Sequence, residues 1–445
     1  MTRTLAVRTG AALLLALALP ALAAAYALPD LAGPWHSQSL ASGPGAPWWE
    51  RGRVVIDTLG GIDVIASTNL GELDTLHFAV ALGPTGILTV PGEPSFHGAV
   101  DLGRTVLVAN DTWAGGTDAG TTEIKVGIKT VSGATLADLA GTWETHSIVS
   151  GASAPWWLHA RVAIAANGAF TGTFVEQGGV PYSGGGTFGV APDGSVTLSL
   201  APDAVGWLDA GRTVLAITNT WGDGVPGSTE LAVALKMANA YAPADLAGTW
   251  ELHSLATGPG APWWNHGQVT VAANGSYSGV MTGSTGGSQP VSGTFSLASD
   301  GTITRSGAPA AHGALDAGRT VMVWTDTWAT GSPGTSEMLI GVRTGGSTAD
   351  VPASGTAAFA LAPVQPNPSR GGALTIRFTL AHAGEARLEL LDVSGRRLDA
   401  RELGARGAGA HTETWARAAR PRPGLYFVRV LQGGEARVRR VTVLE

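Results

Sequence analysis

A small number of polar side chains with chemical potential recur in this chain of 445 residues. Four kinds are found three times each: Ser39, Ser147 and Ser254; Asp101, Asp209 and Asp316; Arg104, Arg212 and Arg319; and Glu123, Glu230 and Glu337. An Asp and a Glu about 5–10 Å apart could hydrolyse a glycosidic bond by acid–base catalysis. Each Asp, however, belongs to an Asp-x-Gly-Arg-Thr sequence, in which Asp can bond backbone amides two residues on and Gly can supply a positive φ. We therefore expect a structural turn there and no catalytic residue.

Histidines recur less regularly. The matched positions hold His146 and His253 where the first copy has Gln38, and His159 and His266 where it has Arg51. Two histidines alone do not make a metal site, which needs three or four ligands. The sequence also lacks the phosphate-binding, zinc-protease and Gly-x-Ser-x-Gly motifs. We expect these histidines to be exposed to solvent, and we expect no metal site and no cofactor.

Tryptophan is the most informative residue type. Four of the 15 recur in each copy, and each copy contains a Pro-Trp-Trp sequence after a loop rich in small residues and Pro. Adjacent residues on a strand face opposite sides, so at most one Trp of each pair can lie in its own core. The other would either pack against a neighbouring copy or offer a flat face to a sugar, a peptide or another subunit. The candidate ligand contacts are Trp48, Trp49, Trp156, Trp157, Trp263 and Trp264.

Three tandem repeats carry these residues. The sequence Asp-Leu-Ala-Gly begins at Asp30, Asp138 and Asp245, so that the copies are 108 and then 107 residues apart. Pro-Trp-Trp, Gly-Arg-Thr and Thr-Trp recur at the same two spacings. A fixed period of this kind indicates repeated structural units. The repeats cover residues 28–131, 136–238 and 243–345.

Each repeat is predicted to be an all-β meander of seven or eight short strands. Asn167-Gly168 and Asn274-Gly275 mark hairpins, because both central residues of the favoured turn need a positive φ. Ile124, Val126 and Ile128 alternate with polar residues in the last strand, which predicts one buried and one wet face. Each repeat would close as a barrel or sandwich, because open sheet edges invite aggregation. The alternative is a six-bladed propeller with two blades per repeat. The Gly-x-Trp that opens each repeat resembles, over a few residues, the start of lipocalin- and avidin-like barrels.

The N-terminal region predicts export. Residues 1–27 have basic residues, a short apolar stretch and small-x-small cleavage candidates ending at Ala23 and Ala27, of which we prefer Ala27. No other segment is long and apolar enough to span a membrane, so we expect no transmembrane segment in the mature chain. The chain has no Cys, which excludes disulfides, and its mild net charge of −7 gives no sign of nucleic-acid binding.

A different module follows a linker at residues 346–358. Residues 359–445 contain Pro366-Asn367-Pro368, a turn at Gly395, the strand from Gly424 through Tyr426, and a final strand with Arg440. This region resembles the C-terminal sorting domain of type IX secretion cargo and the Ig-like domain of flagellar hook-capping proteins. The resemblance implies a small β-sandwich that secretion machinery recognises. These seven residues, Pro366, Asn367, Pro368, Gly395, Gly424, Tyr426 and Arg440, form the expected sorting motif. Family members often have Lys before the last strand, where this chain has Arg439-Arg440.

These features predict a secreted or cell-surface protein without enzymatic activity, in which the repeats have a binding, adhesive or structural role. A glycan or surface polymer is the partner expected for exposed Trp patches. Two alternatives remain. A secreted glycan hydrolase would show one cleft with two carboxylates, and a small-ligand carrier would show an apolar cavity of about 300 Å³ or more inside each repeat.

Overall fold

The computed structural model describes residues 25–344, except 222–226 and 329–332, and most of residues 360–444 with short interruptions. The chain divides into two compact units, residues 1–348 and 349–445. Nearly all regular structure is β, as predicted, and the helices described are single turns: Leu28–Asp30, Gly116–Asp118, α1 (Leu136–Leu139) and Pro243–Leu246. No helix in the described residues has the length and apolar character needed to cross a membrane.

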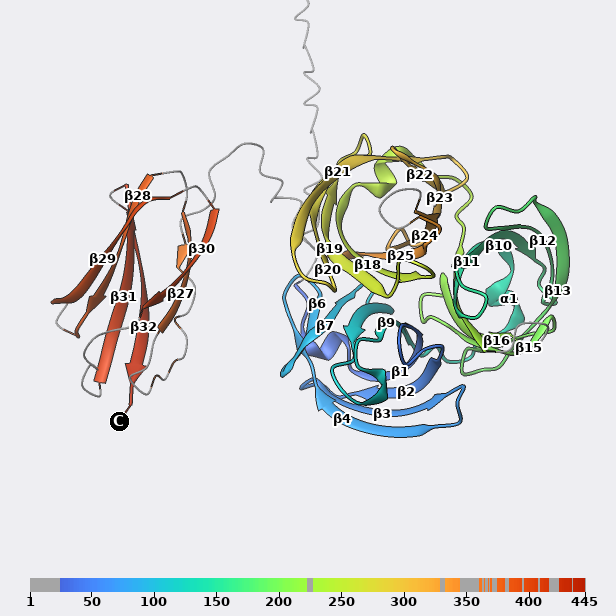
Figure 1. The fold of residues 1–445 in the computed structure, drawn as a ribbon, viewed down its shortest axis with the longest axis horizontal. Coiled ribbons are helices and arrows are strands. Elements are labelled where there is room, and N and C mark those ends of the chain that lie inside the picture. Colours follow the sequence, from blue (N-terminus) through green and yellow to red (C-terminus); the bar gives the residue numbers. More distant parts are fainter. Residues whose placement is uncertain are drawn as a thin grey trace, which may run out of the picture. The chain divides into compact units, whose positions relative to one another are not determined.

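The first repeat forms a nearly closed sheet, here called barrel 1 (Figure 1). Its strands are β1 (Gly33–Ser42), β2 (Trp49–Ile56), β3 (Gly61–Thr68), β4 (Leu73–Ala79), β5 (Ala81–Leu82), β6 (Ile87–Val90), β7 (Glu93–Val100), β8 (Val106–Thr112) and β9 (Thr122–Lys129). The first and last strands pair antiparallel, and the sheet is open only where β4 gives way to β5.

The second and third repeats form closed eight-stranded barrels. Barrel 2 contains β10 (Gly141–Gly151), β11 (Trp156–Ile164), β12 (Ala169–Glu176), β13 (Tyr182–Val190), β14 (Ser195–Leu198), β15 (Ala201–Leu208), β16 (Val214–Trp221) and β17 (Ser228–Lys236). Barrel 3 contains β18 (Gly248–Thr257), β19 (Trp263–Val271), β20 (Ser276–Gly283), β21 (Ser288–Leu297), β22 (Thr302–Arg305), β23 (Ala308–Leu315), β24 (Val321–Thr327) and β25 (Ser336–Thr344). Each repeat is therefore one barrel, and the propeller alternative is wrong.

The repeated Asp-x-Gly-Arg-Thr sequence is a structural turn, as predicted. In barrel 1 the Asp101 carboxylate accepts hydrogen bonds from the backbone amides of Gly103, Thr105 and Val106 at 2.8–2.9 Å. The positive φ belongs to Arg104 (59°) and not to the Gly, which corrects the sequence expectation. That backbone places the Arg104 guanidinium 3.1 Å from the carboxylate of Asp30. The turn thus joins two of the repeated motifs, and the same ion pair recurs in barrels 2 and 3.

The three barrels pack through the first and last strands of each repeat. The strand β1 lies against β16 and β17, β10 against β24 and β25, and β18 against β8 and β9. Each barrel therefore contacts both of the others, and the contacts close into a ring. Leu40, Ile148 and Leu255, each from a different barrel, are fully buried in one shared apolar cluster.

This packing buries the predicted apolar face of the last strand but leaves it without the predicted wet face. Ile124, Val126 and Ile128 are buried, but they belong to the cluster shared between barrels and face outward. The residues that alternate with them, Lys125 and Gly127, line the interior of barrel 1. Both faces of β9 are therefore covered, and the expected wet face is the barrel lumen.

Three tryptophans join the barrels in cyclic order. The indole Nε1–H of Trp49 donates to Thr220 of barrel 2 at 2.7 Å. At the same distance, Trp157 donates to Thr327 of barrel 3, and Trp264 donates to Thr112 of barrel 1. The second Trp of every Pro-Trp-Trp sequence is thus an interface residue.

The Pro of the same motif also contributes to the ring. A Cβ atom added to Gly43 would lie 3.0 Å from Pro262, one added to Gly151 would lie 2.7 Å from Pro47, and one added to Gly258 would lie 2.6 Å from Pro155. The loops of the three barrels therefore approach one another so closely that these glycines have no room for a side chain.

The N-terminal end of barrel 1 includes Tyr26. This side chain is buried in the barrel core and occupies the position that Tyr241 has before barrel 3. Signal cleavage after Ala27, the site preferred from the sequence, would remove Tyr26 from that core. Cleavage after Ala23 would leave it in place.

The unit of residues 349–445 is a β-sandwich. One sheet contains β26 (Ala360–Leu361), β27 (Leu374–Leu380) and β30 (Gly409–Trp415), and the other contains β29 (Arg397–Arg406), β28 (Gly384–Leu391), β31 (Gly424–Gln432) and β32 (Glu435–Val443). The side chains predicted to face inward are all buried in its core: Phe378, Leu388, Leu390, Tyr426 and Val428.

Candidate binding cavities in the barrels

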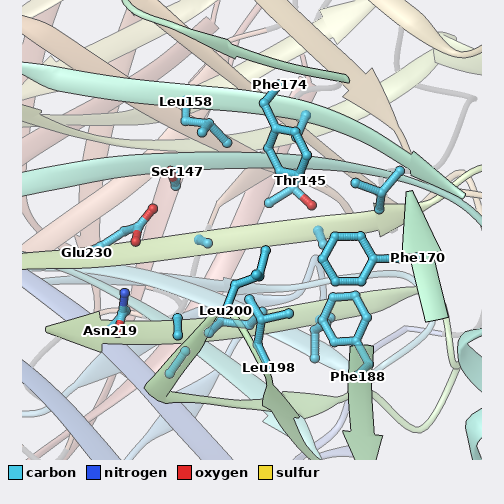
Figure 2. A pocket seen from close by; sticks show the side chains of 18 of the residues that line it. Thr145, Ser147, Leu158, Phe170, Phe174, Phe188, Leu198, Leu200, Asn219 and Glu230 are labelled. Atoms are coloured by element: carbon cyan, nitrogen blue, oxygen red, sulfur yellow. The ribbon is translucent and has the colours of Figure 1, made fainter. Parts of the chain in front are cut away.

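Barrel 2 contains a cavity of about 370 Å³ (Figure 2). Its apolar wall is built by alternate residues of β11, β12 and β13, which point inward because side chains alternate along a strand. Phe170, Phe174 and Phe188 supply the aromatic part of the wall, and Leu158 and Leu198 add aliphatic surface. A cavity of this size and composition is typical of small-molecule sites.

The opposite end of this cavity is polar. Glu230, Asn219 and Ser147 lie together there, away from the phenyl rings, as Figure 2 shows. Ser147 is fully buried and Asn219 nearly so. A carboxylate accepts hydrogen bonds, so this end suits a ligand group that can donate one.

Exposed apolar residues mark the mouth of the cavity. Leu200 and Tyr182 both line the cavity, yet they are 61% and 45% exposed. The Tyr182 hydroxyl donates to Glu176 at 2.8 Å, which fixes the ring at the rim. A large apolar side chain left in water at a cavity entrance is consistent with a surface that a ligand covers.

Barrel 1 has almost no free interior. Its lumen measures about 130 Å³ and contains the Lys125 side chain. The ammonium group lies 2.6 Å from Glu123 and 3.5 Å from Glu50. Although burial opposes the charge, these two carboxylates raise the pKa of Lys125. An internal ion pair therefore occupies the space that is empty in barrel 2.

Barrel 3 has a larger and more open cavity of about 950 Å³. Trp324 and Leu339 project into it, and Trp263 and Trp328 line it near the buried Glu337. The Trp328 Nε1–H donates to Glu337 at 2.9 Å, while burial raises the pKa of that carboxyl group. The cavity is thus partly filled by side chains and has a mixed polar and apolar wall.

One aligned position accounts for much of this difference. Two residues after the repeated Glu, the chain has Lys125 in barrel 1, Ala232 in barrel 2 and Leu339 in barrel 3. All three line the interior of their barrels. The smallest side chain occurs in barrel 2, whose cavity of about 370 Å³ is larger than the lumen of about 130 Å³ in the barrel with Lys125.

The six Trp residues suggested as ligand contacts do not form three exposed patches. Trp49, Trp157 and Trp264 are 4–8% exposed at the barrel interfaces, and Trp48 is also buried. Trp48 packs edge-on against Trp113, as Trp263 does against Trp328. Trp156 and Trp263 are half-buried. Trp263 and Trp264 line the cavity of barrel 3.

The four recurring histidines are not exposed, contrary to the sequence expectation. His146 and His253 are 0% and 2% exposed, and His159 and His266 are half-buried at interfaces. Burial lowers the pKa of His253 to about 3 and that of His266 to about 4. A comparison within repeats could not detect this environment, because the covering residues come from the next barrel.

The repeated Asp and the repeated Glu of barrels 2 and 3 do not lie in the same cavity. Glu230 lines the barrel 2 cavity, whereas Asp209 is in the turn outside it, and Glu337 and Asp316 are related in the same way in barrel 3.

Of the expected sorting motif, Pro366, Pro368 and Gly395 lie outside the described residues. Asn367 contacts the last strand, accepting a hydrogen bond from the Thr442 amide and donating one to the Arg440 carbonyl.

Sequence reasoning missed the aromatic residues of the barrel 2 cavity, although it singled out Ser147 and Glu230 at its polar end. Phe170 and Phe174 differ from one repeat to the next, so a search for repeated residues passed over them, and Phe188 recurs in the third repeat alone, as Phe295. Their signal was the spacing of aromatic residues on β12 and β13, where Phe170 and Phe174 are four residues apart and therefore share one face.

Comparison with known proteins gives no family. No family model matches the chain, and no curated protein matches it. Among solved structures, a protein of unknown function from the DUF3598 family of Nostoc punctiforme is 10% identical, with 47% of this chain and 99% of that chain covered and a TM-score of 0.19. A transferrin-binding protein B of Haemophilus parasuis is 8% identical, with 70% and 76% covered and a TM-score of 0.22. A β-glucuronidase of Faecalibacterium prausnitzii is 10% identical, with 92% and 45% covered and a TM-score of 0.15.

Proposed function

We propose that the three-barrel unit is a non-enzymatic binding protein, and that barrel 2 binds a small, mainly apolar molecule with a hydrogen-bond donor at one end. The observation that carries this proposal is the cavity of about 370 Å³, with phenyl rings at one end and Glu230 at the other (Figure 2). Of the functions considered from the sequence, this is the small-ligand carrier.

The residues that line the barrel 2 cavity indicate the class of ligand. Burying a CH₂ group contributes about 0.8 kcal/mol, so an apolar body provides most of the affinity. The phenyl rings of Phe170, Phe174 and Phe188 favour a flat or aromatic body, since ring pairs add about 0.5–1.5 kcal/mol. A donor group facing Glu230 would fix the orientation. An amine, a hydroxyl or an amide meets this requirement.

Among the described residues, barrel 2 combines a cavity of about 370 Å³ with a mainly apolar wall. Lys125 occupies the corresponding space in barrel 1, and Trp324 and Leu339 intrude in barrel 3. The three barrels would therefore divide their tasks, with barrels 1 and 3 supporting the ring. The resemblance of residues 359–445 to sorting domains supports a role of that unit in export to the cell surface or the medium.

The test uses 1-aminoanthracene, an aromatic amine whose fluorescence rises in apolar surroundings. We expect saturable binding by the full chain with a micromolar Kd. Ala232→Lys should weaken binding at least tenfold, because the new side chain would fill the cavity and pair with Glu230. Ala163→Lys is the matched control. Ala163 is exposed on the outside of β11, so this substitution adds the same charge without filling the cavity.

Equal binding by the two variants would refute the assignment to barrel 2. Absence of binding by the unsubstituted chain would refute the carrier function for ligands of this class. Circular dichroism of both variants, compared with the parent chain, would show that lost binding does not reflect unfolding.

A further inference from the structure

Three potential metal ligands converge where barrel 2 meets barrel 3. Glu144 on β10 and His159 on β11 come from barrel 2, and His312 on β23 comes from barrel 3. One ligand atom from each lies within 4.8 Å of the other two. Glu144 is 1% exposed, and both histidines are half-buried.

The separations suit an ion better than direct hydrogen bonds. The Nδ1 atoms of His159 and His312 lie 3.6 Å and 3.8 Å from the same carboxylate oxygen, Oε1 of Glu144. Both distances are longer than those of hydrogen bonds. Ligand atoms around a tetrahedral zinc ion are about 3.4 Å apart, given metal–ligand lengths of about 2.0–2.1 Å. The Nδ1 atom of His312 is also buried and has no hydrogen-bond partner.

Arg161 orients the carboxylate. Its Nε–H donates to Oε2 of Glu144 at 2.6 Å, which leaves Oε1 directed toward the histidines. The guanidinium also contacts Asp300 and Thr302 of barrel 3. Although burial acts to raise it, the neighbouring His159 and the charge of Arg161 hold the pKa of Glu144 below its ordinary value. Partners of this kind, which position a ligand without touching the metal, are a regular part of metal sites.

The two imidazole rings are stacked, with centroids 3.7 Å apart and planes inclined by 10°. A metal ion lies in the plane of each imidazole that binds it. Binding therefore requires the two rings to turn out of the stack so that their Nδ1 atoms converge. Rotation of this size involves side-chain torsions and leaves the strands in place.

The other two interfaces provide an internal comparison. Between barrels 1 and 2, Arg51 occupies the position of His159, and its guanidinium donates to Thr218 and to the carbonyl of Asp203. A permanent cation is thus present at that interface. Between barrels 3 and 1, His97 and His266 are stacked in the same way, but Gln268 replaces Arg161 beside Glu251.

We propose that Glu144, His159 and His312 form a binding site for a divalent zinc-type cation that joins barrel 2 to barrel 3. Two histidines and one carboxylate leave a fourth position for water in a tetrahedral site. The ligands come from two barrels, so the ion stabilises their interface. This inference is independent of the ligand in barrel 2.

The experiment uses the full chain, purified without a histidine tag and treated with EDTA, and then titrated with ZnCl₂ in a calorimeter. We expect one ion per chain and a higher Tm in the presence of zinc. His312→Val, which introduces the residue found at this position in barrel 2 (Val205), should weaken zinc binding at least 100-fold. His97→Val is the same change at the equivalent position of barrel 1, and it should leave zinc binding intact.

Cobalt provides a second measurement, because tetrahedral Co²⁺ absorbs strongly in the visible range, and this absorption should be lost with His312→Val. Two results would overturn the proposal: no binding by the parent chain below 0.1 mM zinc (about −5.5 kcal/mol of binding free energy), or unchanged binding in His312→Val. The Tm of each variant in EDTA separates loss of a ligand from loss of the fold.

Discussion

Glu251 and Glu144 occupy the same position in successive repeats, but their surroundings differ. Both are nearly inaccessible to solvent. Glu144 has an arginine partner, whereas Glu251 accepts a hydrogen bond from the neutral Gln268 at 2.6 Å. Burial consequently raises the pKa of Glu251 to about 7. The charged form of Glu251 therefore destabilises the folded state at neutral pH.

The raised pKa of Glu251 determines how its contribution to stability changes with pH. Below about pH 4.5 Glu251 is protonated in both the folded and the unfolded chain, and above pH 7 the folded chain must bury a charge. Its contribution to the free energy of unfolding therefore falls as pH rises through this window, by about 3 kcal/mol at most. We expect Glu251→Gln to stabilise the chain at pH 8 and to have little effect at pH 4.5, measured as the change in Tm.

Glu144→Gln in metal-free buffer is the control, because the pKa of Glu144 is lowered and its charge is paired. This variant should destabilise the chain at pH 8, opposite to Glu251→Gln. Equal shifts of Tm at both pH values for Glu251→Gln would contradict the argument.

At the residue scale, sequence analysis found what the repeats share and missed what distinguishes them. The turn at Asp101 was predicted with its hydrogen bonds, because that chemistry is local. The replacement of Lys125 by Ala232 was not recognised as important, because a difference between repeats has no meaning until the lumen is known. Local patterns identify turns, whereas a cavity depends on side chains from several strands.

At the scale of strands, the interface tryptophans offer a direct measurement. Trp157 on β11 is 7% exposed and donates to Thr327 on β24 at 2.7 Å. A buried hydrogen bond contributes about 0.5–1.5 kcal/mol. We expect Trp157→Phe and Thr327→Val to destabilise the three-barrel unit and to couple by about 1 kcal/mol in a double-mutant cycle, measured by urea unfolding.

Trp49→Phe and Trp264→Phe are matched controls at the other two interfaces. Each should destabilise the unit by itself, and neither should couple to Thr327→Val, because their acceptors are Thr220 and Thr112. Absence of coupling between Trp157 and Thr327 would show that the hydrogen bond does not hold the interface.

The period-two pattern of β9 shows why a wet face was predicted incorrectly. The alternation of Ile124, Val126 and Ile128 correctly indicated a strand with one apolar face. A strand with one apolar face normally leaves its polar face in water, and this rule predicted the wet face. In a ring of barrels the outer face is also buried, so the same pattern has two solutions that the sequence alone does not separate.

At the scale of the whole three-barrel unit, the ring explains why the repeats occur as three. A barrel with apolar outer strands would expose that surface if it were alone. Each barrel contacts both others, so ring closure covers all three outer faces without a further partner. The closing contact joins barrel 3 to barrel 1 through Trp264 and Thr112, which are far apart in the chain.

A ring of this kind should not depend on every covalent link between barrels. Ser132 and Gly133, between barrels 1 and 2, are exposed and can be replaced by a specific protease site. After cleavage we expect barrel 1 to remain bound, because Trp49 links it to barrel 2 and Trp264 links barrel 3 to it. Size-exclusion chromatography at micromolar concentration should give one peak that contains both fragments.

The control combines the same cleavage with Trp49→Ala and Trp264→Ala. Replacing a buried Trp by Ala costs about 3–5 kcal/mol, so loss of both side chains should release the fragment that contains barrel 1. Release of barrel 1 from the cleaved parent chain would mean that the linker, rather than the two interfaces, holds it in place. Retention in the double variant would instead assign the stability of the ring to the apolar cluster that Leu40, Ile148 and Leu255 share.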